Sequence, residues 1–367
     1  MTDRPPSPDA SPELRAESWP DGIVAVAPSF KKRFSGVVAT VIGVVPAQAR
    51  RIPIRALGPL PASVPQIGWG AFRLGSWRRP TGRRWRIWHA RRDTEMLFGL
   101  LLRDVLRQPW KLVFTSAAQK RHGPFLRFLI GAMDRVIATS PQAASYLDVP
   151  STVVMHGVDT ERYRPAPDRA AAWAATGLPG RYGIGVFGRV RYQKGQDLFV
   201  EAMAELLPRH PDWTAVVIGL STPSEQPFLS GLKARIAAAG LEQRIIILGE
   251  QPIDKMPDWF ACLSIAVIPA RWEGFGLVPI EAMASGTPVV AARSGAAPDL
   301  VKDGATGHLV PVDDQGALTA AIAKLMAMET PAREAVGRAA RAHVLAEYSI
   351  EREAQKINAV YEEIWAG

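Results

Sequence analysis

Short runs of β-branched and other apolar residues recur along the chain, and longer amphipathic stretches separate most of them. This alternation predicts strands joined by helices, and repeated strand–helix units predict parallel sheets covered by helices on both faces. In the second half the expected strands are 182–187, 213–218, 244–248, 263–268, 288–292 and 307–312. In the first half they are 23–27, 52–57, 84–89, 112–115, 135–138 and 152–155.

Helical periodicity fills the segments between the strands. The expected helices are 37–45, 94–106, 125–133, 196–207, 228–239 and 315–326, followed by 331–347 and 349–365. Two series of strand–helix units predict an α/β protein with two doubly wound lobes that face a central cleft. Ligands of such folds bind at the carboxyl ends of the strands.

The chain has 367 residues, which favours two domains. A stretch rich in Pro, Ala and Gly, 162–180, marks the boundary. We therefore expect a first lobe over 21–165, a second lobe over 166–345, and a last segment, 346–367, that crosses back to the first lobe. Residues 1–20 are rich in Pro and have no apolar core, so they predict a disordered tail and not a signal peptide.

Apolar run lengths and cysteine usage indicate a cytoplasmic protein. The longest apolar stretch, 36–49, is too short to span a bilayer. The single cysteine, Cys262, has no partner for an internal disulfide, which is consistent with a reducing compartment.

Positive charge is concentrated near the start of the chain. The net charge is +9, yet residues 22–92 contain no Asp or Glu. The same stretch holds fourteen basic residues: Lys31, Lys32, Arg33, Arg50, Arg51, Arg55, Arg73, Arg78, Arg79, Arg83, Arg84, Arg86, Arg91 and Arg92. Fourteen exceeds the net charge of the whole chain, so the remainder is net acidic. This part of the first lobe is expected to bind an anion.

Two glutamates, Glu273 and Glu281, flank the string Gly-Phe-Gly-Leu-Val-Pro-Ile. The glycines predict a loop that carries Glu273, and Pro279 suits the first turn of a short helix that carries Glu281 and ends by Gly286. A helix N-terminus with free amides binds phosphate, and carboxylates accept hydrogen bonds from sugar hydroxyls. The segment therefore predicts a nucleotide-sugar site.

The string from Gly183 to Gly188 matches the dinucleotide pattern G-x-G-x-x-G. Such a site requires the glycines to follow a strand and open a helix, whereas here they form the strand itself. The loop after this strand carries Arg189 and Lys194, where doubly wound folds bind phosphates. Arg can donate two parallel hydrogen bonds to a phosphate, and Lys contributes a compact positive charge. The pair alone also fits a solvated basic loop.

Other candidates lie at the ends of expected strands in the first half. His89 ends one strand, and the pair Ser35-Gly36 follows another and precedes a helix. His156 and Asp159 fall in a turn that fits a hinge as well as a ligand contact.

Tryptophans and arginines alternate over residues 69–92, with Trp69, Phe72, Trp77, Trp85 and Trp88 among eight arginines. The same residues suit single-stranded nucleic acid, an anionic membrane surface, or a buried aromatic group with a basic rim. No nucleic-acid-binding motif accompanies them, so nucleic acid is the weakest of the three.

Histidines and cysteine are few and scattered, and the sequence has no Asp-x-Asp motif. We therefore expect no metal site and no cofactor. The charge of a leaving diphosphate would be met by Arg189, Lys194 and backbone amides, without an obligatory metal.

Four motifs together resemble the retaining glycosyltransferases of family 4, which have the GT-B fold. They are Phe187-Gly-Arg189 with Lys194-Gly, His156-Gly-Val-Asp159, the segment Glu273 to Gly286, and Asp303-Gly-x-Thr-Gly307. Three narrower strings are Ile-Trp-His89-Ala-Arg-Arg with Glu95-Met, Phe-Thr-Ser-Ala-Ala-Gln-Lys-Arg-His122 and Val-Met-His156-Gly-Val-Asp. They are similar to the lipopolysaccharide core mannosyltransferases of alphaproteobacteria. The resemblance covers nearly all of the chain past the tail.

The resemblance implies roles for the donor site. Glu281 would hold the ribose hydroxyls, Glu273 the hydroxyls of the transferred sugar, and His89 would meet that sugar from the first lobe. Arg189 and Lys194 would grip the diphosphate. Further donor contacts would come from Ser35, Gly36, Glu250, Ile253, Phe275, Gly276 and Leu277. The family often has Asn where His156 stands, so no catalytic role is assigned to it.

The resemblance also implies substrates: GDP-mannose as donor and a Kdo residue on lipid A as acceptor, with retention of anomeric configuration. Arg33, Arg91 and Arg92 would then meet the acceptor's anionic groups at the inner face of the cytoplasmic membrane. A UDP-sugar donor with another anionic glycolipid or polysaccharide is the alternative. A nucleotide-sugar epimerase, a phosphorylase and a non-catalytic basic adaptor are weaker hypotheses.

Overall fold

The computed structural model describes residues 22–31, 36–118 and 120–367. By contacts the chain divides into two compact units, each described below by itself. Unit 1 contains Met1–Phe114, Ala132–Asp134 and Tyr361–Gly367, and unit 2 contains Thr115–Gly131 and Arg135–Val360. The expected disordered tail, 1–20, lies outside the described residues, and the lobe boundary expected at 165 stays a prediction.

The first sheet has six strands in the order β2-β1-β3-β4-β5-β6. The strands are β1 Ala25–Pro28, β2 Ile54–Leu57, β3 Arg86–Ala90, β4 Trp110–Ser116, β5 Arg135–Ala138 and β6 Thr152–Val153. β1 pairs in parallel with both β2 and β3, with Ala25 opposite Ile54 and Ile87. The chain therefore changes direction across the sheet between β1 and β3, which is the switch point of this fold.

The second sheet has six strands in the order β12-β11-β10-β7-β8-β9. The strands are β7 Tyr182–Phe187, β8 Trp213–Ile218, β9 Ile245–Gly249, β10 Ile265–Ile268, β11 Val289–Ala292 and β12 Gly307–Val310. All pairs are parallel. The switch point lies between β7 and β10, so the loops that follow these two strands diverge there and leave room for a ligand.

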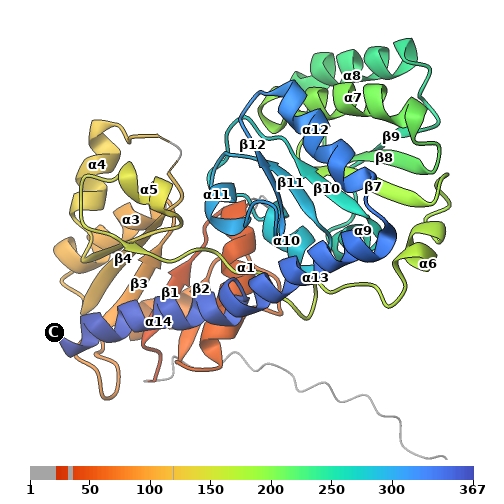
Figure 1. Cartoon of the computed structure of the whole chain (residues 1–367). Helices are drawn as coiled ribbons and strands as arrows, with labels where there is room; N and C mark the ends of the chain where they lie inside the picture. Colours follow the sequence, from red (N-terminus) through yellow and green to blue (C-terminus); the bar gives the residue numbers. More distant parts are fainter. Residues whose placement is uncertain (1–21, 32–35, 119) are drawn as a thin grey trace, which may run out of the picture. The chain divides into compact units, whose positions relative to one another are not determined.

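Helices lie on both faces of the second sheet (Figure 1). In chain order the first helices are α1 Gly36–Ala49, α2 Trp69–Gly75, α3 Asp93–Leu100, the π-helix η1 Leu101–Val105, α4 Pro124–Gly131 and α5 Pro141–Ser145. The others are α6 Arg169–Ala174, α7 Gln196–Leu206, α8 Gln226–Ala238, α9 Met256–Cys262, α10 Val278–Ala284, α11 Ala297–Leu300, α12 Gln315–Met326, α13 Thr330–Glu347 and α14 Ile350–Ala366. Short 3₁₀ turns are η2 Tyr192–Lys194, η3 Leu207–Arg209 and η4 Pro223–Glu225.

Alternating strand residues build two cores in unit 2. Ile184 and Val186 of β7 pack with α7, α8 and α12 on one face, whereas Phe187 packs with α9, α10 and α13 on the other. The remaining central strands divide their side chains in the same way, as the two-residue period of a strand requires. A sheet buried on both faces is held rigidly, so the loops at its edges have fixed starting points.

The glycines of Gly183 to Gly188 serve this packing. A Cβ atom at Gly183 would lie 2.3 Å from the Trp173 ring of α6, and one at Gly185 would lie 2.5 Å from Leu263. The pattern lies on β7 itself, as expected, and its first two glycines admit neighbouring side chains and not a pyrophosphate.

The end of the chain, Tyr361–Gly367, belongs to unit 1, as expected for a last helix that returns to the first lobe. Trp365 of α14 donates its indole N–H to the carbonyl of Trp85 at 3.0 Å, and Arg83 pairs with Glu362 at 2.8 Å. All twelve expected strands and the longer helices are present, with ends that differ by a few residues. The expected helix 94–106 is divided between α3 and η1.

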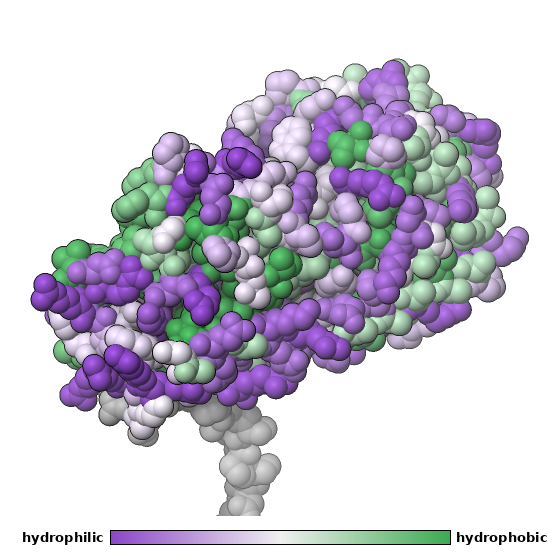
Figure 2. Space-filling model, turned by 60° about the vertical axis from the view of Figure 1, so that its left-hand side comes forward, coloured by the Kyte–Doolittle hydropathy of each residue, from purple (hydrophilic) through white to green (hydrophobic). Residues whose placement is uncertain are grey.

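Some large apolar residues stay exposed, among them Leu74, Val105 and Phe128. Figure 2 shows hydrophobic surface bordered by hydrophilic side chains on the face that it turns forward. Across residues 22–31, 36–118 and 120–367, no helix combines the length and apolar character needed to cross a membrane.

Candidate active site

The loop after β7 begins with close backbone contacts. Gly188 has φ +114°, and a Cβ atom on Gly219, in the loop after β8, would lie 1.8 Å from the Gly188 carbonyl oxygen. The two loops are also hydrogen-bonded, because Val190 N–H donates to the Leu220 carbonyl at 2.9 Å. Only residues without a side chain permit this approach, so the backbone at the end of β7 is fixed.

Lys194 closes the turn η2 and is followed by Gly195, which has φ +71° and precedes α7. A Cβ atom on Gly195 would lie 2.1 Å from the carbonyl oxygen of Pro269, just after β10. The loops after β7 and β10 therefore touch at the switch point of the sheet. This contact places Lys194 next to the segment that carries Glu273.

Arg271 holds the two loops together. Its guanidinium donates to both carboxylate oxygens of Asp197 at 2.9 and 2.8 Å, to Asp313 at 2.8 Å, and to the Tyr192 carbonyl at 2.6 Å. The same group lies 3.6 Å from the centre of the Tyr192 ring. Its side chain is only 8% exposed, so these charge-assisted bonds form with little competition from water.

Lys194 and Glu273 form an ion pair through Nζ and Oε2. Their side chains are 17% and 20% exposed. The Glu273 stem lies over two glycines, since Cβ atoms on Gly276 and Gly295 would each come within 2.9 Å of it. The residues expected to hold diphosphate and sugar are therefore in direct contact, and a ligand that binds either one must compete with the other.

Glu281 lies in the first turn of α10, as expected. The residue keeps some exposed surface, but its carboxyl group is surrounded by protein, and this burial raises the pKa of Glu281 to about 7. Two neighbours act in the opposite direction: a hydrogen bond from the Tyr163 hydroxyl and the charge of Arg162 lower the pKa of Glu281. The pKa of Tyr163 is itself raised, by burial first and then by the charge of Glu281.

Phe275, Gly276 and Leu277 form the turn into α10. Phe275 is buried, its ring lies 4.9 Å from the His156 ring, and its carbonyl accepts a hydrogen bond from Ala296 at 3.0 Å. Gly276 has φ +86°, a conformation that favours glycine. Leu277 caps the helix N-terminus. The buried side chain of Phe275 thus anchors the loop, and the backbone of Gly276 and Leu277 forms the turn.

His156 connects this loop to α14. Its Nδ1 lies 2.8 Å from Oε1 of Glu353, and Oε2 of Glu353 accepts the Gly157 N–H at 2.8 Å. Val158 pairs with Ser349 in a parallel bridge next to these bonds. The turn expected to be a hinge or a ligand contact therefore joins the start of α14 and touches Phe275.

Arg189 and the residues after β9 stand at the same edge of the sheet. Arg189 is exposed on the Lys194 loop, and its carbonyl accepts a bond of 3.0 Å from Gln196, which is buried. Glu250 follows β9 and is exposed, and Ile253 is 51% exposed with its carbonyl accepting from Arg162 at 2.6 Å. A groove of about 1160 Å³ borders this loop, between segment 161–167, α6 and α9.

His89 lies at the carboxyl end of β3 but is fully buried. Its Nδ1 lies 2.6 Å from the Tyr361 hydroxyl. Burial, together with the charge of Arg91, holds the pKa of His89 well below its usual value, so the imidazole is neutral at physiological pH. Its expected contact with the transferred sugar stays a prediction.

The remaining candidates belong to unit 1. Arg91 is buried, and its N–H donates to the buried carboxylate of Glu95 at 2.7 Å. Arg92 keeps partial exposure, and Gly36 is the first residue of α1. Arg33 and Ser35 lie outside the described residues.

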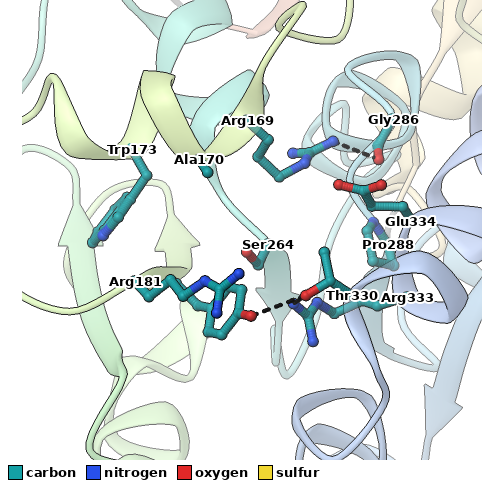
Figure 3. Close-up of a pocket in the computed structure, with 11 residues that line it drawn as sticks. Arg169, Ala170, Trp173, Arg181, Ser264, Gly286, Pro288, Thr330, Arg333 and Glu334 are labelled. Carbon is teal, nitrogen blue, oxygen red and sulfur yellow. Dashed lines mark hydrogen bonds between the residues drawn. The ribbon is translucent and has the colours of Figure 1, made fainter.

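A pocket of about 40 Å³ lies at the opposite edge of the second sheet, at the amino ends of β7, β10 and β11 (Figure 3). Two of its arginines bind the protein itself. Arg169 donates to the carbonyls of Ala261 and Gly286 at 2.9 and 2.8 Å, and Arg333 lies over the rings of Tyr182 and Trp213 at 4.6 and 4.9 Å. These guanidinium groups stabilise the packing of α6 and α13, far from the carboxyl ends of the strands.

The chain is similar in sequence to known proteins. Residues 175–343 match the family described as Glycosyl transferases group 1. Over 338 residues the chain is 51% identical to the lipopolysaccharide core biosynthesis mannosyltransferase LpcC of Rhizobium leguminosarum bv. viciae, a match that covers 92% of this chain and 95% of that protein. The chain belongs to the glycosyl transferases group 1. It is also 48% identical over 347 residues to the lipopolysaccharide core biosynthesis mannosyltransferase LpsB of Rhizobium meliloti, with 93% and 98% covered.

Solved glycosyltransferase structures confirm the fold. The C-terminal domain of a group 1 glycosyltransferase (LpcC) from Francisella tularensis matches with a TM-score of 0.51 and 37% identity, over 53% of this chain and all 100% of that domain. Anabaena HepE, solved in complex with UDP and glucose, matches with a TM-score of 0.75 and 20% identity, over 92% of this chain and 99% of that one. The chain is therefore a glycosyltransferase with the GT-B fold.

Three contributors to the site were not expected from the sequence: Tyr163, Arg271 and Glu353. Each contacts a candidate residue, or the loop that carries it, from a distant position in the sequence. Glu353, for example, contacts His156. Periodicity and local motifs do not report such pairs. An arginine directly before the Glu273 motif was visible, but its partners Asp197 and Asp313 follow only from the fold.

Proposed function

We propose that this glycosyltransferase binds a nucleotide-sugar on unit 2 and transfers its hexose to the inner core of lipopolysaccharide. The contact between Lys194 and Glu273 carries the proposal, because it brings a phosphate-binding cation and a hydroxyl-binding carboxylate together at the sheet's switch point. The name of the relative with 51% identity supports the lipopolysaccharide core and mannose, with GDP-mannose as the donor.

Each donor group has a matching residue. Glu281, ionised, accepts hydrogen bonds from the two ribose hydroxyls, and Tyr163 holds its carboxylate in position. Glu273 accepts hydroxyls of the transferred sugar. Lys194 and Arg189 hold the diphosphate, and the amides of Gly276 and Leu277 add N–H donors at the start of α10.

The proposal includes further contacts with the base, the phosphates and the transferred sugar. We propose that the base lies near Glu250 and Ile253 beyond β9, and that Ser35 and Gly36 contribute donor contacts. His89 contacts the transferred sugar as a neutral imidazole, consistent with its lowered pKa.

Donor binding exchanges ionic partners. In the free protein Lys194 and Glu273 neutralise each other, and the donor offers a phosphate to the first and hydroxyls to the second. As the glycosidic bond breaks, the sugar gains oxocarbenium character and negative charge grows on the leaving phosphate. Lys194 and Arg189 stabilise that growing charge more than the ground state, which is the part of binding that accelerates the reaction.

We propose retention of anomeric configuration, with the acceptor hydroxyl attacking from the face that the leaving group vacates. We also propose that turnover needs no metal, because the two cations and the helix amides supply the charge for the diphosphate. Turnover unchanged by EDTA supports this part, and loss of turnover that Mg²⁺ restores contradicts it.

The acceptor is proposed to be a Kdo residue on lipid A, at the inner face of the cytoplasmic membrane. The test is transfer to Kdo-lipid A from GDP-mannose, UDP-glucose, UDP-galactose and ADP-heptose, each in turn. We expect transfer from GDP-mannose alone. Transfer from a UDP-sugar and none from GDP-mannose contradicts the mannosyl assignment while leaving a glycosyltransferase; conversion of a donor without any acceptor indicates an epimerase.

A further inference from the structure

The tryptophans of the block 69–92 divide into two groups. Trp88 is fully buried between Trp110 and Phe72, and Trp85 is half-buried beneath Lys111 and Arg84. Trp69 and Trp77, in contrast, are 51% and 56% exposed, and Leu74 between them is 77% exposed. The interpretation of the block as a buried aromatic group therefore holds for one part of it, whereas the other part presents large apolar side chains to solvent.

The exposed side chains lie on a firmly held segment. Trp69 contacts the Phe98 ring of α3 at 5.9 Å and the Phe72 ring at 6.1 Å, which joins α2 to the buried aromatic cluster. Arg86 of β3 is fully buried and donates to the carbonyls of Gly75 and Arg78. The backbone on both sides of Trp77 is therefore anchored, so the outward position of Trp77 is fixed by the protein interior.

The same segment is basic. Arg73, Arg78 and Arg79 are exposed, and the nearest acidic residues along the chain are Asp21 and Asp93. Leu97, Leu101 and Val105 are further exposed apolar residues of unit 1, spaced four apart on α3 and η1, with exposures of 43%, 42% and 68%. Large exposed apolar groups in a positive field are unfavourable in water and match the boundary between lipid headgroups and acyl chains.

We propose that segment 69–79, called here the α2 surface, docks on an anionic lipid bilayer. Trp69, Leu74 and Trp77 enter the headgroup layer, and Arg73, Arg78 and Arg79 contact lipid phosphates. The α2 surface thereby holds the enzyme where a lipid-anchored acceptor lies, a step that rests on the proposed function.

Vesicle binding tests the proposal without any transferase reaction. We expect the full chain to sediment with phosphatidylglycerol vesicles, to bind phosphatidylcholine vesicles weakly, and to lose binding as salt rises. Replacing Arg73, Arg78 and Arg79 by Gln is expected to weaken binding about 5-fold per arginine. Trp69→Ser with Leu74→Ser and Trp77→Ser is expected to abolish it.

Leu345→Ser is the matched control, because Leu345 is 44% exposed on α13 and lies outside the α2 surface. It should bind vesicles as the wild type does. Brominated phosphatidylglycerol should quench tryptophan fluorescence in the wild type and much less in Trp69→Phe with Trp77→Phe. Binding without quenching shows adsorption by charge alone and contradicts insertion.

Absence of wild-type binding to anionic vesicles overturns the proposal, and so does equal binding by the α2 variants. Stronger binding to single-stranded RNA, with vesicles displaced by it, also overturns it in favour of nucleic acid. The α2 variants should keep wild-type turnover on a water-soluble Kdo glycoside, which shows that they fold, and lose transfer to vesicle-embedded acceptor. Failure of every transfer with vesicle binding intact would count against the proposed function and leave the docking surface standing.

Discussion

The donor region of unit 2 and the acid-free stretch of unit 1 both use basic side chains, but they hold them differently. At the donor region, Lys194 and Arg271 are paired with the carboxylates of Glu273 and Asp197. In residues 22–92 no carboxylate exists along the chain, and Arg73 and Arg79 face solvent. Cations paired inside the protein keep a fixed geometry, whereas cations without acidic neighbours in sequence increase the local positive field.

The difference separates two kinds of anion binding. A paired cation must exchange its partner, so it discriminates between ligands by geometry and suits catalysis on one diphosphate. Exposed arginines bind diffuse negative charge with little geometric demand and are weakened by salt. The first arrangement fits a donor site and the second a surface, and the following changes are ordered by the size of the effect that this contrast predicts.

Lys194→Ala should have the largest effect. Loss of the cation removes stabilisation of the leaving diphosphate, for which we expect about 2–4 kcal/mol, a fall in kcat of roughly 30- to 900-fold. Steady-state kinetics with a saturating donor measure it. Lys324→Ala, at an exposed position of α12, is the control and should turn over normally. Wild-type kcat in Lys194→Ala would falsify the assignment of this lysine to the diphosphate.

Glu281→Gln should come next, mainly in donor KM. The variant keeps the size of the side chain but loses the charge that accepts both ribose hydroxyls, and we expect KM to rise roughly 10- to 100-fold. In the wild type the pKa of Glu281 is about 7, so donor KM should rise as pH falls below 7 and the carboxylate becomes protonated. A donor KM that stays flat across this range contradicts the role of an ionised Glu281.

Glu281→Gln weakens donor binding, but above pH 7 we expect it to increase the free energy of unfolding. Because the pKa of Glu281 is raised in the folded state from its ordinary value of 4.5 to about 7, the native protein binds the proton more tightly, and the free energy of unfolding falls as pH rises from 4.5 to 7. Glu281→Gln removes this loss, so it should be more stable than the wild type above pH 7, by about 1–3 kcal/mol. Thermal unfolding at pH 5 and at pH 8 (about two units below and one above the pKa of about 7) measures the difference. A variant less stable than the wild type at the higher pH contradicts the account.

Tyr163→Phe should have a smaller effect. The hydroxyl lowers the pKa of Glu281, so its loss should raise that pKa, and donor KM should begin to rise at a higher pH than in the wild type. At alkaline pH, where Glu281 is ionised in both proteins, we expect only about 1 kcal/mol of lost donor affinity. A pH profile of KM that coincides with the wild type indicates that Tyr163 only fills space.

Arg79→Gln should have the smallest effect on the folded enzyme. This arginine is exposed, so we expect the free energy of unfolding to change by less than about 0.5 kcal/mol and turnover on a soluble acceptor to be unchanged. Chemical denaturation measures the first. A destabilisation of several kcal/mol would show that the basic stretch is structural and would remove the contrast with the donor region.

The fold followed from the sequence because each strand carries its own signal. All twelve strands were predicted from short apolar runs, which the buried parallel sheets require, and α12 has the expected bounds Gln315–Met326. The short helices α2, α5, α6, α9 and α11 were not predicted, because a turn or two of helix shows little periodicity. α2 matters most among them, since it carries Trp69 and Leu74 to the surface.

Only part of the candidate site could be predicted from the sequence. Local motifs identified Lys194, Glu273 and Glu281, and the geometry of Gly195 and Gly276 explains why the motifs contain these two glycines. The ion pair between Lys194 and Glu273 and the bond from Tyr163 to Glu281 join residues distant along the chain, which no local pattern reports. Burial also depends on the whole fold: Trp77 and Trp88 look alike in sequence, yet one is exposed and the other fully buried.

The exchange of ionic partners is tested most directly by a crystal structure of the enzyme with GDP bound. We expect the ribose hydroxyls to lie on Glu281, the diphosphate to contact Lys194 and Arg189, and the ion pair between Lys194 and Glu273 to be broken. A nucleotide bound at the carboxyl edge with that pair still intact, or a nucleotide bound elsewhere on the molecule, would contradict it.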